Sequence, residues 1–449
     1  METTAKPINQ ITEGRIWKPL LMFFLPIALG TLFQQLYNTV DAVVVGRFVG
    51  KEALAAVGGS SGQIINLVVG FFVGLSSGAS VIISQFYGAK DTVNLNRTLH
   101  TAVAFSVAGS IFVTILGIAL AEPLLAAMNT PRELMRESSL YLKIYFGGIL
   151  FVFIYNIGSA ALRAVGNSKS PLYYLIVCCI LNVVLDCVLI VVFHMGVAGA
   201  AIATVFSQAV SAVLVLLRLA RSDDPCYRLS LKGLRIEPSF LKRLLYIGLP
   251  AGFQSAMYSL SNIIIQSALN EFGTDSVAAW TAFGKIDGLC WMVIGAMGIS
   301  ATTFVGQNYG ARKFDRMKKS VWICMGITLL FAVLIMAVFL LFADPLFRLF
   351  TDDSAVIAVG MVMLWNMVPY YWIYVPIEIL TGALRGVGDV LIPTLITCLG
   401  VCALRVIWIF VMLPAHHSIE TVMFTYPLTW IVTSIAFLIY FRVRVRTWK

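Results

Sequence analysis

Four acidic residues lie inside long apolar stretches of the sequence and are the strongest candidates for chemistry: Asp41, Asp186, Asp287 and Glu378. An ionisable side chain is costly in the hydrocarbon of a membrane, so such residues usually belong to ion or substrate pathways. Carboxylate oxygens bind protons and hard metal ions. These positions therefore predict cation or proton chemistry within a membrane.

Two of these acids are expected to form one site with a neighbouring amide and hydroxyl. Neither Asp41 nor Asp186 has an obvious basic partner, and Asn182 lies four residues before Asp186 on the same helix face. From the rise per residue of a helix, Asp41, Asp186 and Thr204 lie at similar depths, roughly 6, 10 and 12 Å from one side of the membrane. The sequence thus predicts an ion-coupling site for a proton or sodium at Asp41, Asn182, Asp186 and Thr204. Sodium at Asp41 and Asp186 is the only metal expected.

The other two acids lie in the second half of the chain together with the basic residues Lys285 and Arg405. Opposite charges inside a membrane commonly pair, so one interpretation is a structural polar network. In the other interpretation, Lys285, Asp287 and Glu378 form a second polar site, where Glu378 takes up a proton or contacts substrate. The sequence leaves both interpretations open.

Polar, aromatic and methionine side chains in the apolar stretches are candidates for the lining of a substrate cavity. Methionine adapts to ligands of different shape, and aromatic faces attract organic cations. The candidates are Gln34, Tyr37, Asn38, Asn156, Met257 and Met292. A zinc site at His416, His417 and Glu420 is disfavoured, because zinc requires three or four ligands of fixed geometry.

The composition indicates that these residues lie in membrane-spanning segments. The chain is 59% hydrophobic and 12% charged, against about 45–50% and 25% in soluble proteins. This excludes a soluble enzyme, a disordered chain and a nucleic-acid-binding domain, so the net charge of +10 is attributed to loops facing the cytoplasm. The eight cysteines lie mostly in apolar runs and are interpreted as packing residues.

Twelve apolar runs are long enough to cross a bilayer. They cover 16–45, 53–86, 95–121, 134–161, 171–193, 196–219, 240–270, 276–308, 320–343, 355–382, 391–413 and 420–442. Most loop Lys and Arg fall on the side of the N-terminus, which predicts a multi-pass protein of the cell membrane with both termini in the cytoplasm.

The two halves of the chain repeat each other. Residues 161–171 read ALRAVGNSKSP, and residues 383–393, 222 positions later, read ALRGVGDVLIP. The same offset superposes SQFYGAK on GQNYGAR. We therefore predict a duplicated six-helix unit, with lobes at 1–219 and 240–449 joined by a cytoplasmic linker at 220–239. Because six is even, the two copies are parallel, as in transporters with a cavity between two lobes.

These paired loops, with the stretches LPIALGTLFQQLYNTVDAVVVGRFVG and GVAGAAIATVFSQ, resemble the multidrug and toxic compound extrusion (MATE) family over nearly the whole chain. The resemblance implies an all-α membrane protein with two six-helix lobes around a central cavity. It implies export of organic, often cationic, compounds by antiport with sodium ions or protons. Acids of helices one and five, with this Asn and Thr, form the first-lobe ion site in that family.

Glycines and prolines mark close helix contacts and bends. One helix carries Gly62, Gly70, Gly74 and Gly78 at multiples of four residues, and another carries Gly284 and Gly288. Both faces are expected to let helices approach closely, and a sliding surface is the alternative interpretation. Pro26 and its counterpart Pro250 permit a bend near the start of the first helix of each lobe.

Three other functions remain open. A lipid-linked precursor flippase of a related two-lobed fold would favour more basic residues within the spans, and an intramembrane enzyme would need clustered catalytic groups. A channel is disfavoured because the acid site is not duplicated. The leading prediction is an antiporter, not an enzyme, without a cofactor beyond its coupling ion. Its partners are the lipid bilayer and small organic substrates, not nucleic acid, and it is expected to act as a monomer.

Overall fold

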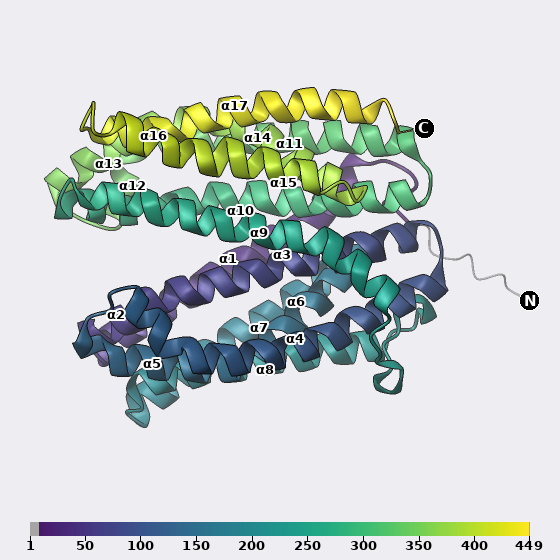
Figure 1. The fold of residues 1–449 in the computed structure, drawn as a ribbon, viewed down its shortest axis with the longest axis horizontal. Helices are drawn as coiled ribbons and strands as arrows, with labels where there is room; N and C mark the ends of the chain where they lie inside the picture. The colour runs from purple at the N-terminus through teal and green to yellow at the C-terminus, as the bar shows by residue number, and fades with distance from the viewer. Residues whose placement is uncertain (1–8, 449) are drawn as a thin grey trace, which may run out of the picture. The chain divides into compact units, whose positions relative to one another are not determined.

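The computed structural model describes residues 9–448, and 86% of these residues are helical. The main helices are α1 (Trp17–Phe48), α2 (Lys51–Gly58), α3 (Ser60–Gly88), α4 (Thr92–Ala127), α5 (Arg132–Gly147), α6 (Ile149–Ala164), α7 (Lys169–Asp186), α8 (Gly196–Ala220), α9 (Pro238–Asn270), α10 (Thr274–Gly310), α11 (Phe314–Leu341), α12 (Ala343–Arg348), α13 (Ser354–Met367), α14 (Tyr371–Gly386), α15 (Leu391–Thr397), α16 (Leu404–Met412) and α17 (Ile419–Val445). Within 9–448 no residue is in a strand. The chain is an all-α protein (Figure 1).

All twelve expected spans coincide with helices. Within residues 9–448, ten helical segments are long and apolar enough to cross a membrane, and the pair α5 and α6, bent by 48°, adds an eleventh. The remaining expected span, 240–270, coincides with α9, which has 33 residues. At 1.5 Å per residue this helix is roughly 50 Å long, more than the hydrocarbon thickness.

The chain forms two compact units. The first unit is Leu25–Gly252, and the second unit is Met1–Phe24 with Phe253–Lys449, of which the structure describes 9–24 and 253–448. This division by contacts falls inside α1 and α9, and the linker 220–239 belongs wholly to the first unit. The lobe boundaries predicted from the sequence, 1–219 and 240–449, stay a prediction.

The two units repeat the same packing. In the first unit α6 packs against α3, α4 and α8, and in the second unit α14 packs against α10, α11 and α17. The helices that occupy matching places lie about 222 positions apart in the chain. The duplication inferred from short sequence motifs therefore extends to the arrangement of helices within each unit.

The repeated loops also share their backbone geometry. Lys90 and Arg312 both have a left-handed φ, of 58° and 56°, and Gly166 and Gly388 have 93° and 88°. The amide after each basic residue donates to the carbonyl five positions earlier, Asp91 to Phe86 and Lys313 to Asn308. This pattern is a helix-ending Schellman turn, so both copies end and restart their helices in the same way.

Helices α3 and α9 approach each other closely through four glycines of the first unit. A Cβ added at Gly74 would lie 2.5 Å from the Gly252 nitrogen, and one added at Gly252 would lie 2.7 Å from the Phe71 carbonyl oxygen. Gly78 and Gly248 form the next such contact along the pair. The predicted role in close packing is confirmed for Gly74 and Gly78.

The same expectation is wrong for Gly284 and Gly288 of α10. A Cβ added at either residue would meet no atom within 4 Å. Glycine spacing alone cannot distinguish a helix contact from an open helix face, because the partner helix is not encoded locally.

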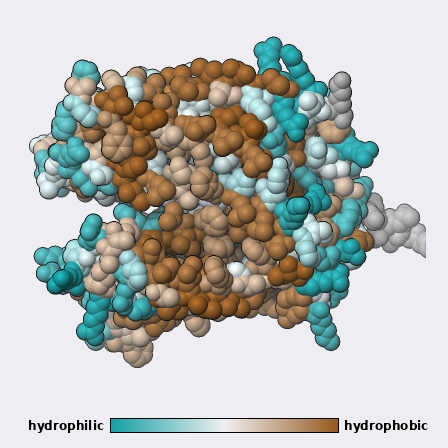
Figure 2. Space-filling model, viewed as in Figure 1, coloured by the Kyte–Doolittle hydropathy of each residue, from teal (hydrophilic) through white to brown (hydrophobic). Residues whose placement is uncertain are grey.

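Hydrophobic side chains cover the middle of the helices on the face drawn in Figure 2, and hydrophilic residues gather at the helix ends. Many large apolar residues of this chain are exposed, among them Ile115 at 67% and Phe410 at 69%. A protein in water rarely exposes such extensive apolar surface, whereas lipid tails solvate it well.

Candidate functional site

The first unit contains a buried polar cluster on α1 and α7. Asp186 and Asn182 are 0% and 1% exposed, and Asp41 is 9% exposed. The carboxyl groups of Asp41 and Asp186 interact electrostatically with each other. The structure therefore brings together the two acids that the sequence predicted to share a site.

Several polar atoms in this cluster have no hydrogen-bond partner in the part of the chain that the structure describes. They are Asp41 Oδ1, both amide atoms of Asn182 and both carboxylate oxygens of Asp186. A buried polar atom without a partner costs free energy, and an unpaired buried charge costs more. A hydrogen bond between the Asp41 and Asp186 carboxyl groups requires a proton on one of them, so the cluster favours an added proton or cation.

Helix α8 supplies neutral oxygens to the surroundings of this cluster. Thr204 is 9% exposed, and Ser207 is fully buried with an unpartnered hydroxyl. Helix α8 packs against α7 and against η1 (Cys187–Val192), the segment that follows Asp186. Thr204 lies on the neighbouring helix as predicted, whereas no hydrogen bond joins it to either acid among the described residues.

Apolar packing encloses one end of the cluster. Val44 and Val45 of α1, Ile190 of η1 and Ala200 of α8 belong to one buried cluster, together with Tyr141 of α5. The low dielectric of such surroundings strengthens any electrostatic interaction with a bound cation.

A π-helical turn directly follows Asp186 and was not anticipated from the sequence. In η1, the Phe193 amide donates to the Val188 carbonyl, five positions earlier. Single π turns inside helices often accompany functional sites. The run CVLIVV contains no proline or glycine that could signal this change of register.

The oxygens of this cluster suit a hard cation better than a transition metal. Two carboxylates and an amide offer oxygen ligands, which sodium accepts. Within residues 9–448 no group of three His, Cys, Asp or Glu side chains could hold a metal ion. In the loop before α17, His417 Nε2 lies 3.4 Å from Glu271 Oε2, and its ring stacks on Phe272.

In the second unit, Asp287 is bound by aromatic donors. Trp291 Nε1 donates to its Oδ2 at 2.5 Å, and the Tyr371 hydroxyl donates to its Oδ1. Trp430 and Tyr374 pack around the Trp291 ring, at centroid distances of 5.7 and 4.7 Å. This carboxylate is satisfied by the protein, in contrast to the acids of the first unit.

Lys285 and Asp287 have different surroundings, and both interpretations of the second-half charges stay predictions. Lys285 is exposed and makes no ion pair with Asp287. Two residues apart on one helix, their side chains point in different directions. Arg405 instead donates to Asn262 at 3.3 Å and lies over the Tyr426 ring at 4.2 Å.

Glu378 of α14 lies against α10 of the second unit. A Cβ added at Gly298 of α10 would collide with its carboxyl group, and Glu378 interacts electrostatically with Arg385. Arg385 also donates to Gln254 at 3.5 Å. Arg385 is the residue that the sequence analysis missed as a partner, although it lies in the repeated ALR motif.

The candidate cavity residues are distributed over both units. In the first unit, Gln34 and Asn38 are exposed, Tyr37 is 7% exposed, and Asn156 donates to the Val152 carbonyl at 2.8 Å. Asn156 also lines a small pocket with room for about one water molecule. Met257 and Met292 of the second unit are half-buried. Their role in a substrate cavity stays a prediction.

Comparisons with known proteins agree with this architecture. The MatE family model matches residues 26–188 and 250–411. The Bacillus subtilis "Probable multidrug resistance protein YoeA" is 27% identical over 93% of this chain and 91% of its own length. The Thermotoga maritima "Probable multidrug resistance protein NorM" is 26% identical, with 90% and 87% coverage.

A solved structure shows the same fold. An outward-facing multidrug resistance MATE family transporter superposes with a TM-score of 0.92 and 22% identity, covering 99% of each chain. The predicted fold, an all-α membrane protein with twelve helices in two lobes, is confirmed. With the family model matching most of the sequence in both repeats, the chain belongs to the MATE family of multidrug transporters.

Proposed function

We propose that this transporter is a secondary active antiporter that exports organic, often cationic, compounds in exchange for sodium ions or protons. The observation that carries the proposal is the buried group of unpartnered polar atoms on Asp41, Asn182 and Asp186. The names of the relatives, which refer to multidrug resistance, support export of organic compounds.

The proposed coupling follows from charge. Two carboxylates in a buried cluster are costly without a counter-charge, because burial removes their hydration. A proton or sodium ion taken up by Asp41 and Asp186 offsets this cost, and Asn182 supplies a neutral carbonyl oxygen. Thr204 on α8 completes the proposed site from the neighbouring helix.

Exchange requires that the ion-bound and ion-free protein bind substrate differently. A coupling ion changes an equilibrium only as far as its affinity differs between the two conformations. In the proposed cycle, ion uptake by the cluster favours the conformation that releases substrate, and ion release favours rebinding. The polar and aromatic candidates Gln34, Tyr37 and Asn38 share α1 with Asp41, which offers a direct mechanical connection.

The experiment measures export in everted membrane vesicles that contain the protein. A fluorescent organic cation is followed after a sodium gradient or a proton gradient is imposed separately. Asp41→Asn and Asp186→Asn each keep the side-chain size but remove the charge, so coupled export should fall at least about tenfold, within the usual range of coupling free energies. Asp344→Asn is the matched control, because Asp344 is an exposed acid paired with Arg348.

The two gradients separate the candidate ions. Export driven by sodium at constant pH identifies sodium, and export driven only by a pH difference identifies protons. If Asp186→Asn exports at the unaltered rate with the same ion dependence, the proposed coupling site is wrong.

The proposal also specifies the orientation of the chain in the membrane and its oligomeric state. Both termini lie on the cytoplasmic side of the cell membrane, and the monomer, surrounded by lipid, is the functional unit. Accessibility of a terminal tag in intact and opened cells tests the topology, and light scattering of the purified protein tests the assembly. A tag accessible from outside intact cells would refute the orientation.

A further inference from the structure

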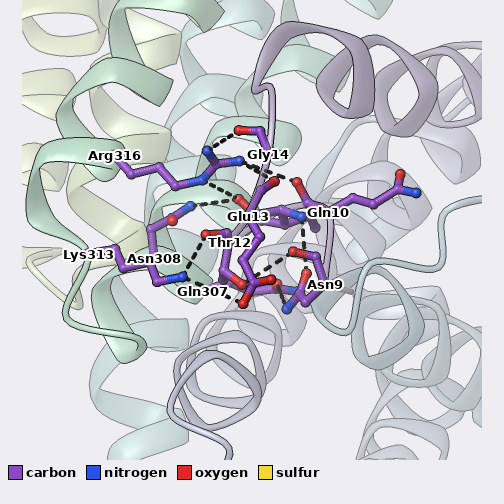
Figure 3. Close-up of polar contacts among 10 residues, drawn as sticks. Asn9, Gln10, Thr12, Glu13, Gly14, Gln307, Asn308, Lys313 and Arg316 are labelled. Carbon is purple, nitrogen blue, oxygen red and sulfur yellow. Dashed lines mark hydrogen bonds and ion pairs between the residues drawn. The ribbon is translucent and has the colours of Figure 1, made fainter. Parts of the chain in front are cut away.

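The segment before α1 is bound to the second unit through its main chain. We call residues Asn9–Gly14 the strap. Arg316 of α11 donates from Nε to the Ile11 carbonyl at 3.0 Å and from Nη1 to the Gly14 carbonyl at 2.6 Å (Figure 3). Its Nη2 donates to the carbonyls of Gln10 and Glu13, at 3.3 and 2.9 Å. One guanidinium thus binds four carbonyl groups of six consecutive residues.

The start of α11 and the end of α10 supply further contacts. Lys313 Nζ donates to the Thr12 carbonyl at 2.9 Å, and Asn308 Nδ2 donates to the Ile11 carbonyl at 3.2 Å (Figure 3). The side-chain amide of Asn9 donates from Nδ2 to Gln307 Oε1 at 3.0 Å. Charged donors make the stronger class of hydrogen bond, so the strap is held mainly by the two cations.

Local sequence explains why the carbonyls converge. The amides of Thr12 and Glu13 both donate to the Asn9 carbonyl, which folds the strap into a turn. Gly14 follows with a φ of 70°, a conformation that glycine adopts without a Cβ penalty. The left-handed Arg312 on the other side places Lys313 and Arg316 at the beginning of α11.

The strap precedes the first turns of α1, which end at a proline where the helix bends more easily. The helix begins at Trp17, and the N-terminal segment of the second unit ends at Phe24, two residues before Pro26. Proline lacks an amide hydrogen, so Pro26 cannot donate to the Met22 carbonyl and the helix is easier to bend there. The strap therefore fixes one end of a short helical piece whose other end is a proline, and beyond it α1 belongs to the first unit.

The corresponding segment of the second repeat is bound by different chemistry. Residues 231–236 lie 222 positions after the strap, and the chain on either side contacts α4 within the first unit. The Ser230 amide donates to His100 Nε2 at 3.0 Å, and the Glu237 amide donates to the Thr101 hydroxyl at 3.3 Å. Among the described residues, cations bind the main-chain carbonyls at only one of these two related segments. The other repeat folds without such a clamp, so the fold itself does not require it.

We propose that the strap is a releasable latch, bound by Arg316 and Lys313 in the conformation described here and detached in the opposite conformation of the transport cycle. The inference rests on the proposed alternating transport. The four hydrogen bonds of Arg316 to the strap end on main-chain oxygens, and the Glu13 carboxylate adds attraction to Arg316 and lies 3.8 Å from Lys313 Nζ. All these contacts are reversible, because water can replace each of them. Release frees the first turns of α1 to move about Pro26.

The first test measures detachment without relying on transport. Thr12 is 6% exposed, so in a chain without native cysteines the thiol of Thr12→Cys should react with a maleimide only after the strap detaches. Arg316→Gln should raise the labelling rate about tenfold, the equivalent of losing one hydrogen bond to a charged group. Lys319→Gln, at an exposed position of the same helix, is the matched control and should leave the rate unchanged.

Turnover should raise the same labelling rate. Addition of an organic cation together with an ion gradient should expose the Thr12→Cys thiol in the otherwise unaltered chain. A labelling rate that responds neither to turnover nor to Arg316→Gln would overturn the latch. The effect of Arg316→Gln on the labelling rate can be measured even if the chain transports none of the tested compounds. Absence of transport would refute the proposed function, not the latch.

The second test locks the strap. In the double variant Thr12→Cys and Lys313→Cys, a short cleavable bifunctional maleimide should reduce export at least about tenfold, comparable with other coupling effects. Equilibrium binding of the organic cation should persist, and cleavage of the linker should restore export. If the cross-linked protein exports at the rate of the same variant before cross-linking, the strap does not detach and the latch is refuted, while the proposed function stands.

Discussion

The glycine contact between α3 and α9 gives a prediction whose size follows from the structure. A methyl group at Gly74 would lie 2.5 Å from the Gly252 nitrogen and 2.6 Å from the carbonyl atoms of Ala251. Ordinary contacts between such atoms are about 3.5–4.0 Å. The clashing atoms are backbone and cannot rotate away, so Gly74→Ala must push the helices apart by roughly 1 Å.

This displacement should destabilise the protein by about 1–3 kcal/mol, the typical cost of overpacking a well-packed contact. The matched control is Gly288→Ala, because a methyl group there meets no atom within 4 Å. Alanine is a better helix former than glycine, so this change should stabilise α10 by about 0.5–1 kcal/mol. The same substitution therefore has opposite signs at the two positions.

Thermal unfolding of the purified protein in detergent, followed by the loss of helical signal, measures both effects. The midpoint should fall for Gly74→Ala and rise or stay constant for Gly288→Ala. Combining Gly74→Ala with Gly252→Ala should cost less than the sum of the single changes, because helices already separated accept a second methyl group more easily. Equal midpoints for Gly74→Ala and Gly288→Ala, or strict additivity of the pair, would refute the reasoning.

Three further predictions concern polar residues. Asn182→Ala and Thr204→Ala should each raise the ion concentration needed for half-maximal export by about fivefold, since each removes one neutral ligand; an unchanged ion dependence would exclude the residue from the site. Asp287→Asn should lower the unfolding midpoint and alter the tryptophan emission, because it weakens the charged acceptor of Trp291, and unchanged emission would contradict that hydrogen bond. His100→Ala should accelerate proteolysis of the linker by removing the acceptor of an amide, and equal cleavage rates would contradict this contact.

The positions of the helices could be predicted because they depend on local information. An apolar run of about 20 residues has few alternatives in a bilayer, where backbone groups must be satisfied within the helix. The repeat could also be recognised from local sequence, because the left-handed turns at Lys90 and Arg312 occur in short motifs that both halves share. The shared burial of Asp41 and Asp186 followed from their depths alone.

The contacts that could not be predicted share one cause, because each depends on which residue tertiary packing brings alongside. Lys285 and Asp287 have opposite charges, but their spacing on α10 separates their side chains, and Asp287 finds Trp291 and Tyr371 instead. Nothing near Arg316 in the sequence indicates that it binds carbonyls about 300 positions away. Such contacts depend on tertiary packing, which local composition does not encode.

The duplicated backbone carries chemistry that is not duplicated. The positions 222 residues after Asn182, Asp186 and Thr204 hold Leu404, Trp408 and Tyr426. The second repeat therefore has no carboxylate at the position of Asp186. Trp408 instead donates its indole hydrogen to the Thr421 carbonyl at 2.9 Å, linking α16 to α17. Because the unpartnered acids occur in one repeat and the cationic clamp on the strap in the other, each copy has retained the fold while taking on a different task. Under the proposed antiport, this asymmetry would leave one ion site without a competing second copy, and under the proposed latch the second repeat would hold the moving end of α1.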